Sequence, residues 1–364
     1  MTIDRRDFFK LAAKTAACAA VVGASSAHAR ESKKVPEEAL GLLFDGTLCI
    51  GCRACMPACK EANGMPAERL PLEANGQVSA LWDAPLDISG QTLNVIKAYR
   101  DGTGLNKDAV TDGYAFTKQS CYHCADPSCV SACPVSAMTK DPVNGIVSYN
   151  AEACIGCRYC VAACPFGVPR FTYDTPKPVI SKCQLCKHRL EQGGFAACAT
   201  VCPTGATLFG KVKDLKKEID RRKTLTPGTT TRFPRGRLGG NDFYVGKVGR
   251  YVKRVYGEKE IGGTQVLHLS GVPFELLDKP ELPDVAPAAL SETIQHGLYY
   301  GLLAPATFLG ILVAAARRNM LAAGTQLARS DGRSPTVAEQ GREPRPVSEL
   351  PEHDPDAKPR EEKP

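Results

Sequence analysis

Cys-Ile-Gly-Cys-Arg-Tyr-Cys-Val-Ala-Ala-Cys-Pro, residues 154–165, places three cysteines within seven residues and a fourth cysteine four positions later. A backbone with this spacing wraps around three corners of a cube-shaped [4Fe–4S] cluster. The fourth cysteine starts a short helix and points away, so it binds a second cluster. The same spacing begins again at Cys49. The repeat therefore predicts paired clusters.

The cysteines of the whole chain follow this rule. The chain has 364 residues and 17 cysteines, and all of them except Cys18 fall into four groups of four. The first and third groups have the C-x2-C-x2-C-x3-C spacing of bacterial ferredoxins. With Cys at every one of these positions, the sequence predicts four [4Fe–4S] clusters. The groups are Cys49, Cys52, Cys55 and Cys59; Cys121, Cys124, Cys129 and Cys133; Cys154, Cys157, Cys160 and Cys164; and Cys183, Cys186, Cys198 and Cys202.

Two other uses of cysteine fit the pattern less well. A zinc site takes four ligands in two pairs, whereas here three cysteines crowd together and a fourth follows. Cysteines separated by two residues rarely satisfy disulfide geometry, and here that spacing recurs in every group. The sequence therefore favours iron–sulfur clusters over zinc and over disulfides.

The N-terminal residues 1–29 resemble an export signal and not a part of the fold. Arg5-Arg6 precedes an alanine-rich apolar stretch, and Ala27-His28-Ala29 supplies a cleavage site between small residues. The pair of arginines is similar to twin-arginine signals, whose translocation machinery exports proteins that are already folded. Because such signals export folded proteins, we predict that the protein is exported with its clusters already bound. Cleavage after Ala29 would remove Cys18 and leave sixteen cysteines.

A membrane anchor is predicted near the C-terminus. Residues 293–316 contain no Asp, Glu, Lys or Arg, and Gly297 to Ala316 are 20 largely apolar residues. This length is enough to cross a bilayer, although a buried core helix is the alternative. Arg317-Arg318 at its end places that side in the cytoplasm. We therefore expect a transmembrane helix over 293–316, a disordered cytoplasmic tail over 317–364, and the cluster domain on the periplasmic face.

The rest of the chain predicts an α+β protein without an active site of its own. Residues 30–210 form the four-cluster domain, and 211–290 form a mixed cap with a charged helix from Lys211 to Lys223 and a strand over 264–269. The chain has no P-loop, dinucleotide fingerprint or nucleophile elbow. Its charge of +7 is a weak basic bias and does not predict nucleic-acid binding.

We expect residues between and beside the cysteines to support the clusters. We expect Val135, Ile155, Phe166 and Val168 to shield clusters from water, although plain core packing is compatible. His123 and His188 are expected at the surface or behind the ligands. The cations next to cysteines either offset cluster charge or form a solvated face; they are Arg53, Lys60, Arg158 and Lys187.

The order of the four groups resembles the electron-transfer subunits of membrane-bound oxidoreductases, of the formate dehydrogenase, dimethyl sulfoxide reductase and hydrogenase-2 types. The resemblance covers residues 1–319. It implies tandem, interlocked ferredoxin-like domains, with an outer pair over 40–62 and 180–210 and an inner pair over 118–170. The features that favour the hydrogenase-2 branch are the twin arginines, residues 102–108, 256–260 and 262–267, Ile294-Gln295-His296 and Arg317-Arg318.

The same resemblance implies which cysteines share a cluster. Cluster one would use Cys49, Cys52, Cys55 and Cys202; cluster two would use Cys121, Cys124, Cys129 and Cys164; cluster three would use Cys154, Cys157, Cys160 and Cys133; and cluster four would use Cys183, Cys186, Cys198 and Cys59. Lys60 replaces the proline that usually follows the last cysteine of such a group, which leaves the ligand itself in place.

The function implied by the resemblance is electron transfer without catalysis. The chain would connect the small and large subunits of a nickel–iron hydrogenase to a membrane-integral subunit that reacts with quinone. Two alternatives stay open. In the first, the partner is a formate dehydrogenase, another molybdenum or tungsten oxidoreductase, or a multihaem cytochrome. In the second, the clusters have a structural or storage role and pass no electrons.

Overall fold

The computed structural model describes residues 29–66, 85, 87–172 and 179–330. It separates into two compact units, one covering 26–297 and the other containing the chain from Leu298 onwards. Apart from Ala29, the predicted export signal lies outside the described residues.

A four-stranded sheet forms the centre of the unit at 26–297. Its strands are β1 (Leu40–Asp45), β9 (Thr207–Lys211), β11 (Gly236–Arg237) and β13 (Val266–Leu269), in the order β11-β9-β1-β13. β1 pairs antiparallel with β9 and parallel with β13. Because Gly41 through Asp45 are all buried, β1 is a central strand with both faces covered.

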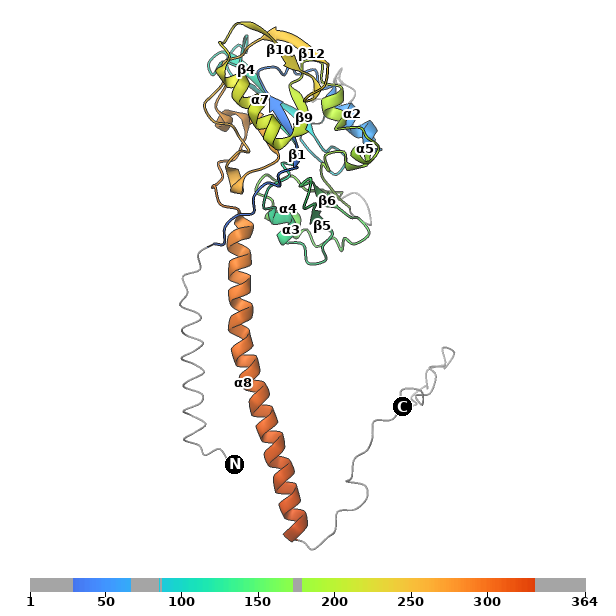
Figure 1. Cartoon of the computed structure of the whole chain (residues 1–364), viewed down its shortest axis with the longest axis vertical. Coiled ribbons are helices and arrows are strands. Elements are labelled where there is room, and N and C mark those ends of the chain that lie inside the picture. The colour runs from blue at the N-terminus through green and yellow to red at the C-terminus, as the bar shows by residue number, and fades with distance from the viewer. Residues whose placement is uncertain (1–28, 67–84, 86, 173–178, 331–364) are drawn as a thin grey trace, which may run out of the picture. The chain divides into compact units, whose positions relative to one another are not determined.

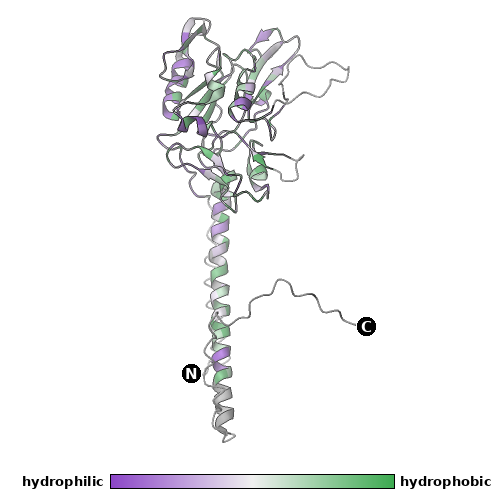
Figure 2. Ribbon diagram, turned by 90° about the vertical axis from the view of Figure 1, so that its right-hand side faces the viewer, coloured by the Kyte–Doolittle hydropathy of each residue, from purple (hydrophilic) through white to green (hydrophobic). Residues whose placement is uncertain are grey.

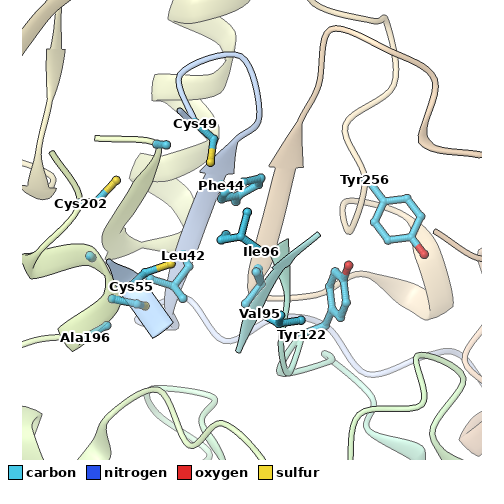
Figure 3. Close-up of a cluster of buried hydrophobic side chains, with 14 of the residues drawn as sticks. Leu42, Phe44, Cys49, Cys55, Val95, Ile96, Tyr122, Ala196, Cys202 and Tyr256 are labelled. Atoms are coloured by element: carbon cyan, nitrogen blue, oxygen red, sulfur yellow. The ribbon is translucent and has the colours of Figure 1, made fainter. Parts of the chain in front are cut away.

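The two faces of this sheet pack against different parts of the protein. Leu43, Leu208 and Leu267 form a core with the apolar side of helix α7 (Val212–Thr224), which confirms the charged helix predicted there. On the other face, Leu42 and Phe44 pack among cysteines, and Figure 3 shows them beside Cys49, Cys55 and Cys202. The alternation follows from the two-residue period of a strand.

The sheet joins parts that the sequence placed in separate domains. β1 and β9 belong to the predicted cluster domain at 30–210, whereas β13 and α7 belong to the predicted cap at 211–290. Since strands of both pair directly, the boundary at residue 210 does not divide independently packed units. The strand predicted over 264–269 is present as β13.

Short elements carry the cysteine groups. Helix α2 (Cys55–Ala62) contacts α6 (Ala197–Thr200), and α3 (Ser128–Ser131) contacts α4 (Tyr159–Ala163). The first contact joins cysteine groups one and four, and the second joins groups two and three. In the sequence, the hairpin of β5 (Met138–Lys140) and β6 (Val147–Tyr149) lies between α3 and α4. Figure 1 shows these elements in the globular part of the chain.

The remaining elements complete this unit. A second sheet has the order β2-β4-β3, and two small antiparallel pairs are β10 with β12 and β7 with β8. Their bounds, with those of the last short helices, are β2 (Val95–Arg100), β3 (Asn106–Lys107), β4 (Gly113–Gln119), β7 (Arg170–Phe171), β8 (Ile180–Ser181), β10 (Thr230–Pro234), β12 (Phe243–Lys247), α5 (Lys187–Glu191), η1 (Glu260–Gly262) and η2 (Phe274–Leu277).

Helix α8 (Pro287–Ser330) contains the predicted anchor but is longer than predicted. It begins within the predicted cap, at a proline, which is favoured in the first turn of a helix. It continues through 317–330, so disorder was wrongly predicted for that part of the tail. Residues 319–330 include three Ala and two Leu, which are strong helix formers. The tail from 331 lies outside the described residues.

The most apolar part of α8 is not buried among the described residues. Among the described residues, α8 is the one helix that is long and apolar enough to cross a membrane, and none of its most apolar stretch is buried. In Figure 2, many residues of this helix have the green colour of hydrophobic residues. The observation disfavours a buried core helix and leaves α8 as a candidate membrane helix.

Candidate iron–sulfur centres

The structure brings the sixteen described cysteines together in four sites, and each site draws on two separate segments of the chain. Four thiols line one cavity at site 1, another at site 4 and a third at site 3, while the thiols of site 2 are electrostatic neighbours. Site 1 has Cys49, Cys52, Cys55 and Cys202; site 2 has Cys121, Cys124, Cys129 and Cys164; site 3 has Cys133, Cys154, Cys157 and Cys160; and site 4 has Cys59, Cys183, Cys186 and Cys198.

The four sites form a row. Cys55 of site 1 neighbours Cys198 of site 4. Cys183 of site 4 neighbours Cys121 of site 2. Cys129 of site 2 neighbours Cys160 of site 3. The order along the row is therefore site 1, site 4, site 2 and site 3, which differs from the order of the groups in the sequence.

Among the sixteen described cysteines, the exposed ones lie at the two ends of this row. Cys52 of site 1 and Cys157 of site 3 are exposed, whereas all the cysteines of sites 2 and 4 are buried or half-buried. Ile50 and Ile155, two positions before these exposed thiols, are 57% and 65% exposed. The row is thus closed in the middle and accessible at both ends.

Of the four residues expected to shield the sites from water, two are buried near the middle of the row and two are exposed at its end. Phe166 and Val168 are buried near site 2, as expected. Val135 and Ile155 line site 3 but are 37% and 65% exposed, so the prediction that they shield this site from water was wrong. They stand at an accessible end of the row.

Backbone geometry turns amide groups towards the thiols. The N–H groups of Gly156, Leu185 and Thr207 donate to the Sγ atoms of Cys154, Cys183 and Cys202, each at 3.4 Å. Gly156 and Leu185 have positive φ angles of 71° and 53°, which bend the chain around the sulfur. Hydrogen bonds to the sulfurs are one of the means by which a protein tunes the potential of a cluster.

Gly51 gives a first test of this geometry. Its φ is +70°, and a Cβ atom here would lie 2.4 Å from Cζ of Phe116. We expect Gly51→Ala to displace the loop of site 1 and to lower the bound iron by about one cluster, or four irons. Gly64→Ala is the matched control, because its φ is +62° but nothing lies within 4 Å. Both variants carry a backbone strain of about 1–2 kcal/mol. Equal iron contents in the two would contradict the argument.

The thiols can serve as ligands only when they lose their protons. Burial raises the pKa of Cys49 and Cys59 to about 12 and that of Cys160 to about 11. The thiolate is the form that binds metal, so a bound cation must supply the charge that drives deprotonation. None of the sixteen described cysteines forms a disulfide. Within the described ranges, no three His, Cys, Asp or Glu side chains are placed to hold a single metal ion. Soft four-thiol sets around cavities fit iron–sulfur clusters.

The four cations that lie next to cysteines in the sequence differ in their burial and in their partners. Lys60 is buried, but its Nζ donates to the carbonyl oxygens of Pro66 and Gln91 at 3.0 and 2.8 Å. The Arg158 guanidinium lies 4.7 Å from the centre of the Phe171 ring. Lys187 is exposed and forms an ion pair with Glu191. Arg53 is half-buried and, like Arg158, has a left-handed backbone.

Three lysines that neighbour the thiols were not predicted from the sequence. Lys118 neighbours Cys55 and Cys198, Lys182 neighbours Cys129, and Lys140 neighbours Cys124. Lys118 and Lys182 are 1% and 3% exposed. The sequence offered one signal for two of these lysines: Lys118 lies three residues before Cys121, and Lys182 lies directly before Cys183.

The two histidines behave differently from one another. His188 is exposed, which agrees with the surface role expected of it. His123 is fully buried and has a φ of +48°. Its Nδ1 accepts the N–H of Val147 at 3.0 Å, and its Nε2 has no hydrogen-bond partner among the described residues. His123 is therefore a buried residue behind the ligands.

The fold and the four thiol sites define the class of the protein, a ferredoxin-type iron–sulfur protein. Residues 113–212 match the 4Fe-4S dicluster domain. The chain is 43% identical over 321 residues to the hydrogenase-2 operon protein HybA of Escherichia coli O157:H7, covering 87% of this chain and 96% of that relative. It therefore belongs to the HybA family of iron–sulfur proteins.

A second group of relatives has the same kind of role. The nitrate-inducible formate dehydrogenase iron-sulfur subunit of Escherichia coli K12 is 30% identical over 277 residues, which cover 74% of this chain and 82% of that relative. Relatives of this kind are iron–sulfur subunits of oxidoreductase complexes and not catalytic subunits. The chain is accordingly an iron–sulfur electron-transfer subunit, and it is not an enzyme by itself.

Proposed function

We propose that this chain carries electrons one at a time along four [4Fe–4S] clusters bound at sites 1, 4, 2 and 3. One observation carries the proposal: four sets of four thiols form a row that is buried in the middle and accessible at its two ends. A storage or structural role requires neither the row nor the exposed ends.

The chain's own residues hold and tune these clusters. Each site supplies four thiolates, and all sixteen cysteines act as ligands in the sets defined above. The clusters, when bound, supply reversible one-electron chemistry. The amides of Gly156, Leu185 and Thr207 stabilise charge on the sulfurs, and Tyr122 and Phe166 exclude water near site 2.

The proposed direction of flow follows from the start of α8. Arg30 donates to Glu292 on α8 at 2.8 Å and to both carboxylate oxygens of Asp126 at 2.6 and 3.0 Å. Asp126 precedes α3, the helix that carries Cys129 of site 2. Sites 2 and 3 therefore lie on the side of the domain where α8 begins. Electrons enter at site 1 and leave from site 3 towards the membrane partner.

The proposed partners are a nickel–iron hydrogenase of hydrogenase-2 type, with its small and large subunits, and a membrane-integral subunit that reduces quinone. Oxidation of hydrogen to two protons releases two electrons, and quinone takes up two electrons and two protons. The similarity to HybA over most of the chain supports this pairing. A formate dehydrogenase, or another molybdenum or tungsten enzyme, is the second candidate, and the relative at 30% identity supports it.

The proposed location is the periplasmic face of the bacterial cytoplasmic membrane. The twin-arginine signal at 1–29 directs export of the folded domain, α8 crosses the bilayer, and Arg317-Arg318 hold the C-terminus in the cytoplasm. Pro305 inside α8 is compatible with a membrane-spanning helix.

Charged substitutions in α8 test the anchor. Leu309 and Ile311 are 61% and 58% exposed. We expect the double variant Leu309→Lys/Ile311→Lys to leave the membrane fraction, because each lysine near the centre of a span costs about 3 kcal/mol. Met320→Lys, beyond the arginine pair, should stay membrane-bound. Fractionation followed by immunoblotting measures the difference, and retention of the double variant in carbonate-washed membranes would count against a spanning helix.

Anaerobic purification in mild detergent tests the partner. The proposal predicts that hydrogenase subunits copurify with the chain and that hydrogen gas reduces its clusters. Reduction by formate and not by hydrogen would assign the chain to the second candidate. Copurification of neither enzyme, with clusters that respond to neither donor, would contradict both.

A further inference from the structure

Lys118 differs from the other buried lysines in what surrounds its ammonium group. Its side chain lies on β4 and is 1% exposed. Among the described residues, its oxygen partner is Oγ1 of Thr207, at the long distance of 3.5 Å. By contrast, Lys60 donates to two carbonyl oxygen atoms at 3.0 and 2.8 Å, and Lys279 donates to two oxygen atoms at 2.7 and 3.0 Å.

Cysteine thiols, and not further oxygen acceptors, lie near the ammonium group of Lys118. The ammonium of Lys118 neighbours Cys198 and Cys59, both in site 4. It also neighbours Cys55 of site 1, and Thr207, whose Oγ1 lies 3.5 Å from its Nζ, lines the cavity of site 1. The side chain lines the cavity of site 4. Lys118 is thus a buried cation that contacts site 4 and also neighbours the next site in the row.

A buried ammonium group is stable only where an opposite charge or good acceptors compensate it. Since Thr207 alone is a poor acceptor at 3.5 Å, the compensating charge is on the thiolates and clusters of sites 1 and 4. Each one-electron reduction adds a negative charge to a cluster. A fixed positive charge in a low-dielectric interior favours the reduced form of every cluster near it.

We propose that Lys118 is a positioning charge shared by sites 1 and 4, which raises the reduction potentials of both clusters together. This inference rests on the proposed function, since it requires clusters at both sites. It identifies the first transfer step, from site 1 to site 4, as the one whose two potentials depend on a single side chain. Removal of Lys118 therefore lowers both potentials, while sites 2 and 3 keep theirs.

Redox titration of the anaerobically purified complex, followed by electron paramagnetic resonance, tests the inference. In Lys118→Met we expect two of the four midpoint potentials to fall and two to stay. Lys118→Arg, which keeps the charge, should retain all four. Lys34→Met is the control that removes a positive charge at the surface, since that side chain is 86% exposed, and it should change none.

The outcomes separate this inference from the proposed function. If the wild type holds four reducible clusters and Lys118→Met has full iron with four unchanged potentials, the inference fails and the proposed function stands. If the wild type lacks reducible clusters, the proposed function fails. Loss of iron from two sites in Lys118→Met, restored by Lys118→Arg, also supports the shared charge. Loss from all four sites in both variants would overturn it in favour of a general folding role.

Discussion

Replacing Cys198 with alanine is expected to remove one cluster and to stop electron transfer through the protein. Cys198 belongs to site 4, which lies between site 1 and site 2 in the row. Without site 4, an electron at site 1 has no neighbouring acceptor. The iron content should fall from about sixteen to about twelve atoms, since each cluster holds four. Electron transfer from the catalytic partner to quinone should fall to background.

The control for this variant is Thr200→Ala. Thr200 is an exposed residue on the same short helix, α6, and its Oγ1 contacts only the local carbonyl of Ala196 among the hydrogen bonds of the described residues. It should keep the full iron content and the full rate. Iron analysis and hydrogen-dependent quinone reduction measure both variants. A Cys198→Ala protein with a normal rate would show that electrons bypass site 4, which the row does not allow.

Replacing Arg222 with methionine is expected to cause the largest loss of stability. Arg222 on α7 and Asp45 at the end of β1 are both fully buried, and Nη1 of Arg222 lies 2.8 Å from the carboxylate of Asp45. The variant leaves the Asp45 charge without its cation, which costs about 3–5 kcal/mol. For a domain of this size, the thermal midpoint should fall by about 10 °C.

Arg221 on the same helix provides the matched control. It pairs with Glu218, which also pairs with Arg222, but the Arg221 side chain is 38% exposed. An exposed pair contributes at most about 1 kcal/mol, so Arg221→Met should shift the midpoint by only a few degrees. Heating at a fixed scan rate, with cluster absorbance and circular dichroism as probes, measures both. Equal shifts would mean that the buried pair with Asp45 adds no stability.

The cysteine spacing predicted more than any other feature of the sequence. The spacing of the groups beginning at Cys49 and Cys154 depends only on local geometry, because three thiols within seven residues can reach one cluster without help from the rest of the chain. Helix α7 was also predictable, since its apolar residues recur at helical spacing. The ferredoxin-type class and the HybA family follow from these local patterns.

Features that depend on distant contacts were not predictable. Lys118 reads as a polar residue in a strand, and only the packing of β4 against sites 1 and 4 makes it a buried cation. The pairing of β1 with β13 crosses more than 200 residues and removes the expected boundary between cluster domain and cap. The ends of α8 were misjudged because helix propensity continues past the apolar stretch.

The most direct test of the account is a count of iron and of redox transitions in the anaerobically purified protein. Chemical iron analysis and a redox titration followed by electron paramagnetic resonance should give about sixteen irons and four clusters that each accept one electron. Far fewer irons, or clusters that cannot be reduced at any accessible potential, would contradict the proposal that this chain is an electron-transfer row of four clusters.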